Sequence, residues 1–200
     1  MNFAAAQEEI SALLRSFERR PHHVFHVAEL AVQLFYELLP LHGLRDRERL
    51  LLEAAAFLHD LGRATDDSGK DHHKESARLI REHRWQSFTP GDVAVIAEVA
   101  RYHRKSLPQA THEDFAALSP MDQATVEILA ALLRIADGLD RTHRGLVTHV
   151  KAEIAAERIT LHLYGSAEAQ AEQAGGKRKS DLAENLFRRE VVVVLHPTPG

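Results

Sequence analysis

Apolar residues recur every three to four positions over almost all of the first 145 residues, and this spacing is what most limits the fold. We expect helices over 3–17, 21–40, 46–61, 72–83, 90–103, 114–118 and 119–142. Pro21 and Pro120 suit the first turn of a helix, where the missing N–H costs nothing, and Ser119 is a favourable N-cap. The spacing therefore predicts a mainly α fold.

The pattern changes after Gly145. Residues 147–154 and 158–164 alternate between apolar and polar positions and are rich in β-branched residues, which is typical of strands. Residues 167–186 look helical with an interruption at Gly175-Gly176 and the basic run Lys177-Arg178-Lys179, and 191–195 is a short apolar strand. We expect a helical domain over 1–145 and a small strand–helix–strand appendage over 146–200.

A His-Asp pair, His59-Asp60, closes one apolar helical stretch, and Asp137 lies inside a second one. Burying such groups among apolar residues costs free energy unless a partner compensates for the lost water. Arginine salt bridges are one such partner, and a divalent metal is the other. We favour the metal, because a histidine and carboxylates brought together from distant helices are typical metal ligands.

Histidines are numerous, at 14 in 200 residues, and several stand at predicted helix ends, where side chains of different helices can meet. These are His22, His23, His26, His72, His73 and His103. The chain has no cysteine and therefore no thiolate ligand. Imidazole and carboxylate ligands suit Mn²⁺, Fe²⁺, Co²⁺, Ni²⁺ or Zn²⁺ better than Ca²⁺.

Cationic residues accompany these groups along the chain. The set comprises Arg63, Lys74, Arg104, Lys105, Arg141 and Arg144. Arg141 and Arg144 share a face with Asp137 if their helix continues that far. One such residue is usually part of a solvated surface, but the repeated placement indicates an anionic ligand, most naturally phosphate.

Bulk properties exclude several classes of protein. The net charge of −4 gives no indication of nucleic-acid binding, and no apolar run is long enough to cross a membrane. The absence of cysteine and an N-terminus unlike a signal peptide lead us to expect a cytoplasmic protein. An exposed strand edge in the tail would offer a pairing surface for a homodimer.

The order His23, His59-Asp60 and Asp137 resembles the HD superfamily of metal-dependent phosphohydrolases, an all-helical fold. In that pattern the first histidine lies four residues before a valine, as His23 does in HVFHV. The resemblance therefore favours His23 as the first ligand, with His22 and His26 as the alternatives.

Further motifs extend this resemblance. HDLGR, HHKESARLI, ARYHRK and LLRIADGLDRTHRG are similar to the C-terminal region of the exopolyphosphatase/guanosine pentaphosphate phosphohydrolase family. His72 and His103 match two histidines of two-metal HD proteins, which implies a dinuclear site, with His73 as the alternative to His72. Glu75 stands where that family often has another histidine. The sequence has no counterpart of that family's actin-like domains, so we expect a stand-alone HD domain.

These observations predict a phosphohydrolase that cleaves a phosphate ester or phosphoanhydride of a nucleotide-like substrate, with a metal activating the attacking water. One or two ions of Mn, Fe, Co, Ni, Zn or Mg are expected. The predicted ligands are His23, His59, Asp60, His72, His103 and Asp137, and the predicted catalytic residues are Asp60, Lys74, Arg104 and Arg141. The six cations named above would bind phosphate. The alternative is a non-catalytic module that binds polyphosphate or a nucleotide.

Overall fold

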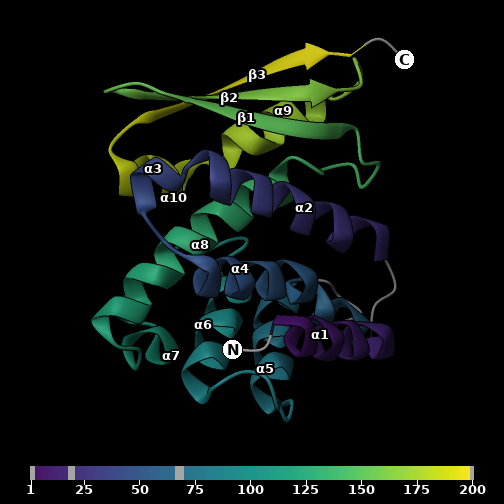
Figure 1. Ribbon diagram of the computed structural model, residues 1–200, viewed down its shortest axis with the longest axis vertical. Helices are drawn as coiled ribbons and strands as arrows, with labels where there is room; N and C mark the ends of the chain where they lie inside the picture. Colours follow the sequence, from purple (N-terminus) through teal and green to yellow (C-terminus); the bar gives the residue numbers. More distant parts are fainter. Residues whose placement is uncertain (1–2, 18–20, 66–69, 199–200) are drawn as a thin grey trace.

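The computed structural model describes residues 3–17, 21–65 and 70–198, and within them helices pack beneath a three-stranded sheet (Figure 1). The helical elements are α1 (Phe3–Phe17), α2 (Pro21–Glu37), α3 (Leu39–His42), α4 (Asp46–Leu58), the 3₁₀ turn η1 (Leu61–Ala64), α5 (His72–Glu82), α6 (Pro90–Arg101), α7 (Glu113–Ala116), α8 (Pro120–Gly138), α9 (Gln170–Arg178) and α10 (Asp181–Phe187). The strands are β1 (Val147–Ile154), β2 (Arg158–Gly165) and β3 (Glu190–Pro197). The predicted mainly helical fold with a small C-terminal sheet is confirmed.

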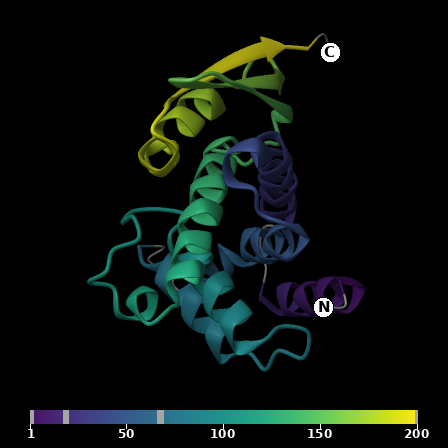
Figure 2. The ribbon, with the colours of Figure 1, turned by 60° about the vertical axis from the view of Figure 1, so that its left-hand side comes forward.

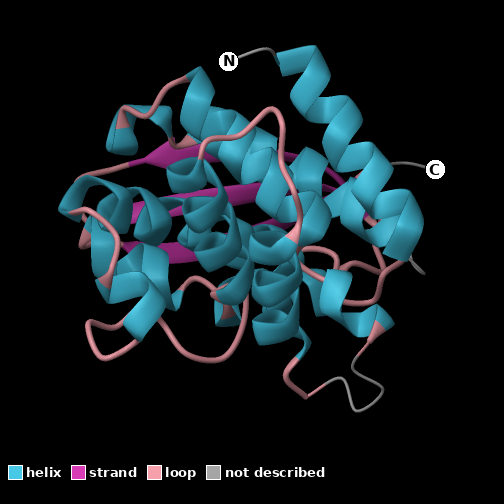
Figure 3. Cartoon of the chain, turned by 90° about the horizontal axis from the view of Figure 1, so that it is seen from below, coloured by secondary structure: helices cyan, strands magenta, loops and turns pink. Residues whose placement is uncertain are grey.

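The sheet lies at one end of the molecule with α9 and α10 against it, and α2 and α8 run between it and α1, α4, α5 and α6 (Figure 2). Seen from below, the helices stand in front of the strands (Figure 3). Leu34 of α2, Leu132 of α8 and Leu161 of β2 belong to one buried apolar cluster. The sheet therefore shares a core with the helices, and the domain boundary at residue 145 stays a prediction. Among the described residues, no helix has the length and apolar character needed to cross a membrane.

The helix that carries the His-Asp pair ends earlier than expected. The sequence predicts it to continue through Leu61, but α4 ends at Leu58 and the chain turns before η1. The Ser76 hydroxyl of α5 donates to the His59 carbonyl over 2.7 Å and accepts from the Gly62 amide over 2.9 Å. A Cβ at Gly62 would lie 2.3 Å from the carbonyl oxygen of His72, so glycine allows α5 to approach this turn closely.

Another predicted boundary that shifts is the end of α8, which stops at Gly138 rather than Thr142. A Cβ at Gly138 would lie 2.6 Å from the Gly175 carbonyl oxygen, so the two backbones are in close contact. Gly175 lies inside α9, and the helical break comes after Arg178. The predicted interruption is therefore wrong at Gly175-Gly176, because these glycines serve packing between α8 and α9, but the helix does break at the end of the predicted basic run, at Lys179.

The strand order is β1-β2-β3, with β1 antiparallel and β3 parallel to β2. Side chains of α2 cover part of the β1 edge, since Gln33 accepts from the Val150 amide and Glu37 from the Ala152 amide. On β3, Glu184 accepts from the amide of Val191 over 2.8 Å. These amides are not available to a second copy of the chain. The homodimer through a strand edge stays a prediction.

Candidate metal centre

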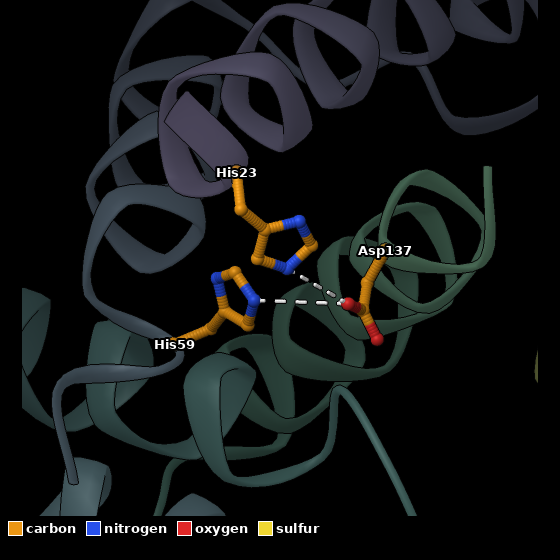
Figure 4. Close-up of side chains that lie close together, drawn as sticks. All are labelled: His23, His59 and Asp137. Carbon is orange, nitrogen blue, oxygen red and sulfur yellow. Dashed lines mark ion pairs between the residues drawn. The ribbon is translucent and has the colours of Figure 1, made fainter. Parts of the chain in front are cut away.

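Three helices bring a first group of ligand atoms together (Figure 4). His23 comes from the first turn of α2, His59 follows α4, and Asp137 lies in the last turn of α8. The Nε2 atoms of His23 and His59 lie 3.4 and 3.8 Å from Oδ1 of Asp137. The ligand atoms of the three residues all lie within 4.8 Å of one another, a spacing that allows them to hold one metal ion.

The far nitrogens of both rings are already bonded. Nδ1 of His59 lies 2.7 Å from the carbonyl oxygen of Ala56, and Nδ1 of His23 lies 2.7 Å from Oδ2 of Asp140. Such partners fix the orientation of a metal-binding imidazole. Both Nε2 atoms are buried and, among the described residues, have no hydrogen-bond partner. Two orphaned imidazole nitrogens beside a carboxylate fit a divalent cation, which would satisfy both.

A second group shares His59 with the first. The ligand atoms of His59, Asp60 and His103 lie within 4.8 Å of one another. Nε2 of His72 is 3.1 Å from Oδ1 of Asp60, and Nδ1 of His103 is 2.6 Å from the Ala100 carbonyl oxygen. Asp60 therefore lies between His72 of α5, His103 in the turn after α6 and the histidines of the first group, and its carboxylate could contribute to either group of ligands.

Both carboxylates also carry a cationic partner. Arg63 donates through Nε to Oδ2 of Asp60 over 2.5 Å, and the Lys179 ammonium donates to Oδ2 of Asp137. Burial raises the pKa of Asp60, but interactions with His59, His72, His103 and Arg63 outweigh it and hold the pKa well below its ordinary value. The pKa of Asp137 is also well below its ordinary value, because Lys179 and His23 outweigh burial. Both residues are ionised and suited to a cation.

The histidines differ in charge. Burial lowers the pKa values of His59 and His103, so both rings are neutral near pH 7 and their Nε2 lone pairs are free to coordinate. For His23, burial lowers the pKa, but its contacts with Asp137 and Asp140 prevail and raise it to about 9. Binding of a metal at His23 therefore requires the loss of a proton.

A basic cleft of about 320 Å³ opens onto the cluster, with His103 and Asp137 in its lining. The cations that line it are Arg63, Arg104, Lys105, Arg141, Arg178 and Lys179. Four of these six are predicted phosphate-binding residues. The other two predicted residues lie elsewhere: Lys74 lines a different cleft, and Arg144 lines another and pairs with Glu168 over 2.7 Å. Such a charge distribution suits a phosphate group beside the metal ligands.

A comparison with known protein families identifies the family of this chain. The family described as Ppx/GppA phosphatase, domain III, matches residues 7–184. The chain belongs to this family. The resemblance predicted from the linked histidine and aspartate motifs is thus confirmed. A comparison with curated proteins finds no match.

Within this Ppx/GppA domain III fold, the alternative first ligands lie away from the cluster. His22 is exposed, and it lines a neighbouring cleft of about 610 Å³ together with His26. His73 lines the same cleft as Lys74, whereas its neighbour His72 contacts Asp60. The geometry thus places His23 and His72, rather than their alternatives, beside the carboxylates.

Sequence reasoning missed four residues of this Ppx/GppA site: Asp140, His143, Arg178 and Lys179. Asp140 orients His23, and His143 stacks on the His23 ring with centroids 3.7 Å apart. Asp140 is a carboxylate three residues after Asp137, but it lies beyond the end of α8, so helical spacing gave no signal for its contact with His23. The basic run Lys177-Arg178-Lys179 is visible in the sequence, but nothing local shows that it reaches Asp137.

Proposed function

We propose that this chain is a divalent-metal-dependent phosphohydrolase that acts on a phosphate ester or phosphoanhydride. The observation that carries the proposal is the pair of buried Nε2 atoms of His23 and His59, which face Asp137 and have no hydrogen-bond partner among the described residues. The basic cleft over these groups supports a phosphate substrate rather than a neutral one. Membership of a phosphatase family is consistent with this chemistry.

In this proposal His23, His59 and Asp137 hold one ion, and Asp60, His72 and His103 hold a second ion or complete the first shell of ligands. A cation bound there would acidify water and so supply a nucleophile at neutral pH.

The cations of the cleft bind the substrate. Arg104 and Arg141 line the cleft and hold the phosphate oxygens, which stabilises the charge that develops on them. Arg63 keeps Asp60 ionised and in place. Lys105 is tied to the carbonyl oxygen of Lys70 at 2.5 Å and closes one side of the cleft.

The test measures metal content and hydrolysis on the same preparations. Wild-type protein should contain a divalent metal by elemental analysis and should hydrolyse one class among phosphomonoesters, nucleotides and cyclic dinucleotides with added Mn²⁺. Asp60→Ala should lose both metal and turnover. Asp46→Ala, which removes an exposed carboxylate from the start of α4, should lose neither. Full turnover in chelator-treated protein would refute the proposal.

One observation favours a second candidate, a phosphate-binding module without catalysis. Arg63 and Lys179 already neutralise the two carboxylates, so the cluster can persist without an ion. The cleft cations would then hold a polyphosphate chain by charge alone. Tight binding of polyphosphate by wild-type protein that contains no metal and hydrolyses nothing would support the module over the enzyme.

A further inference from the structure

A second cleft lies beside the basic one and shares Arg104 with it. Its volume is about 210 Å³, and its lining includes His73, Lys74 and Arg101. We propose that this second cleft binds a phosphate-type oxyanion at a site separate from the metal centre. This inference goes beyond the proposed hydrolysis, because, apart from the shared Arg104, it assigns a ligand to residues that the proposed hydrolysis does not use.

Charge and helix geometry support an anion here. His73 and Lys74 lie in the first turn of α5, an 11-residue helix whose amino end carries the positive end of the helix dipole. The Lys74 amide itself donates to the Asp71 carbonyl over 2.9 Å, so the helix end contributes through its dipole and the Lys74 ammonium. Arg101 and Arg104 bring two guanidinium groups from the end of α6 and the turn that follows. The start of α5 and the end of α6 thus both contribute cations to this small cleft.

The acidic neighbours leave room for a ligand. The Lys74 ammonium is 3.8 Å from Oδ1 of Asp71, and the Arg101 guanidinium is 3.7 and 3.6 Å from the carboxylates of Glu98 and Asp114. These separations exceed those of direct hydrogen bonds, so N–H groups of both cations can still donate to an oxyanion.

His73 supplies an independent indication. Its side chain lines this cleft although the residue is only 3 % exposed. Its Nδ1 is buried and has no hydrogen-bond partner in the described part of the chain. A buried polar nitrogen without a partner costs free energy. A phosphate oxygen in the cleft would offer the ring the acceptor that the protein does not provide.

The second cleft is close to the metal centre. The ring centroid of His73 lies 6.0 Å from that of His72 and 6.4 Å from that of His103. The oxyanion therefore has two sources with the same chemistry: a free phosphate ion, or a second phosphoryl group on a substrate whose first phosphoryl group occupies the basic cleft.

Calorimetric titration of metal-free protein separates these sources. We expect wild-type protein to bind two orthophosphate ions per chain. Lys74→Gln, a change at a side chain 61 % exposed, should weaken one of the two sites about fivefold, the upper range for one exposed charge pair. Arg84→Gln removes an exposed charge that lines neither cleft and should change nothing.

Tripolyphosphate is the second probe. If one tripolyphosphate ion binds per chain and Lys74→Gln weakens this binding, the ligand is a second phosphoryl group of a longer substrate. If only orthophosphate binding weakens, the ligand is free phosphate. A single orthophosphate site in wild-type protein, or identical binding by Lys74→Gln and Arg84→Gln with both probes, would overturn the proposal. Neither titration needs metal or turnover, so an inactive protein can still pass this test.

Discussion

The charge of His23 gives the most direct test of the site's electrostatics. The pKa of this ring is raised from 6.5 to about 9 by its contacts with Asp137 and Asp140, against the opposing effect of burial. At about 1.4 kcal/mol per pKa unit, this corresponds to about 3 kcal/mol in favour of the imidazolium. Replacing Asp140 with Asn removes the charge behind the 2.7 Å contact with Nδ1 and should lower the pKa of His23 by about one unit.

Metal binding should show the same competition with a proton. Because Nε2 of His23 must lose its proton to coordinate, the metal affinity of wild-type protein should rise about tenfold per pH unit up to pH 9 and then level off. In Asp140→Asn the plateau should begin near pH 8, about one unit lower, and lie ~10-fold lower in affinity, because the ring is less well oriented. Asp46→Asn should follow the wild-type curve.

The stability of the metal-free protein has the opposite dependence on pH. A pKa raised on folding stabilises the folded state fully below the unfolded value of 6.5, and this contribution is lost as the pH rises through about 9. Wild-type protein in chelator should therefore melt at a lower temperature at pH 9 than at pH 6.5. The melting temperature of Asp140→Asn should fall by less between these two pH values. Calorimetric metal titrations and an NMR titration of the His23 ring measure these quantities. Equal midpoints for His23 in both proteins would refute the reasoning.

Two further changes test the packing and the charge of the site. Gly62→Ala places a Cβ 2.3 Å from the backbone oxygen of His72 and should lower the free energy of unfolding by ~2 kcal/mol in chemical denaturation. Gly91→Ala, whose Cβ meets only one side-chain atom at 3.9 Å, should leave it unchanged. Equal effects of the two changes would contradict the close approach at Gly62. Lys179→Met removes the ammonium from Asp137 and should increase the affinity for Mn²⁺ about tenfold at pH 7, because a cation no longer competes at this carboxylate. Calorimetric titration measures this affinity, and an unchanged value would show that the lysine does not oppose the metal.

Local sequence signals identified the elements but not all of their ends. The bounds of α1 and β1 are those predicted, because apolar spacing and alternation are complete within those segments. The start of α8 agrees as well, since the Ser119 side chain accepts from the Asp122 amide as an N-cap. The end of α4 was not predictable in this way. It depends on hydrogen bonds from Ser76, a residue 14 positions further along the chain than Gly62.

Part of the site was also not predictable from local sequence, because it depends on the contact between α8 and α9. The prediction that Arg141 and Arg144 share a helical face with Asp137 required α8 to continue, but α8 ends at Gly138, where the backbone of Gly175 lies against it. Lys179 follows Gly175 by one helical turn and donates its amide to the Gly175 carbonyl over 3.1 Å. The packing of α9 at the end of α8 is therefore what sets the Lys179 ammonium on Asp137. A basic run is usually a solvated surface, and only the tertiary approach of two glycines makes two of its members, Arg178 and Lys179, part of the site.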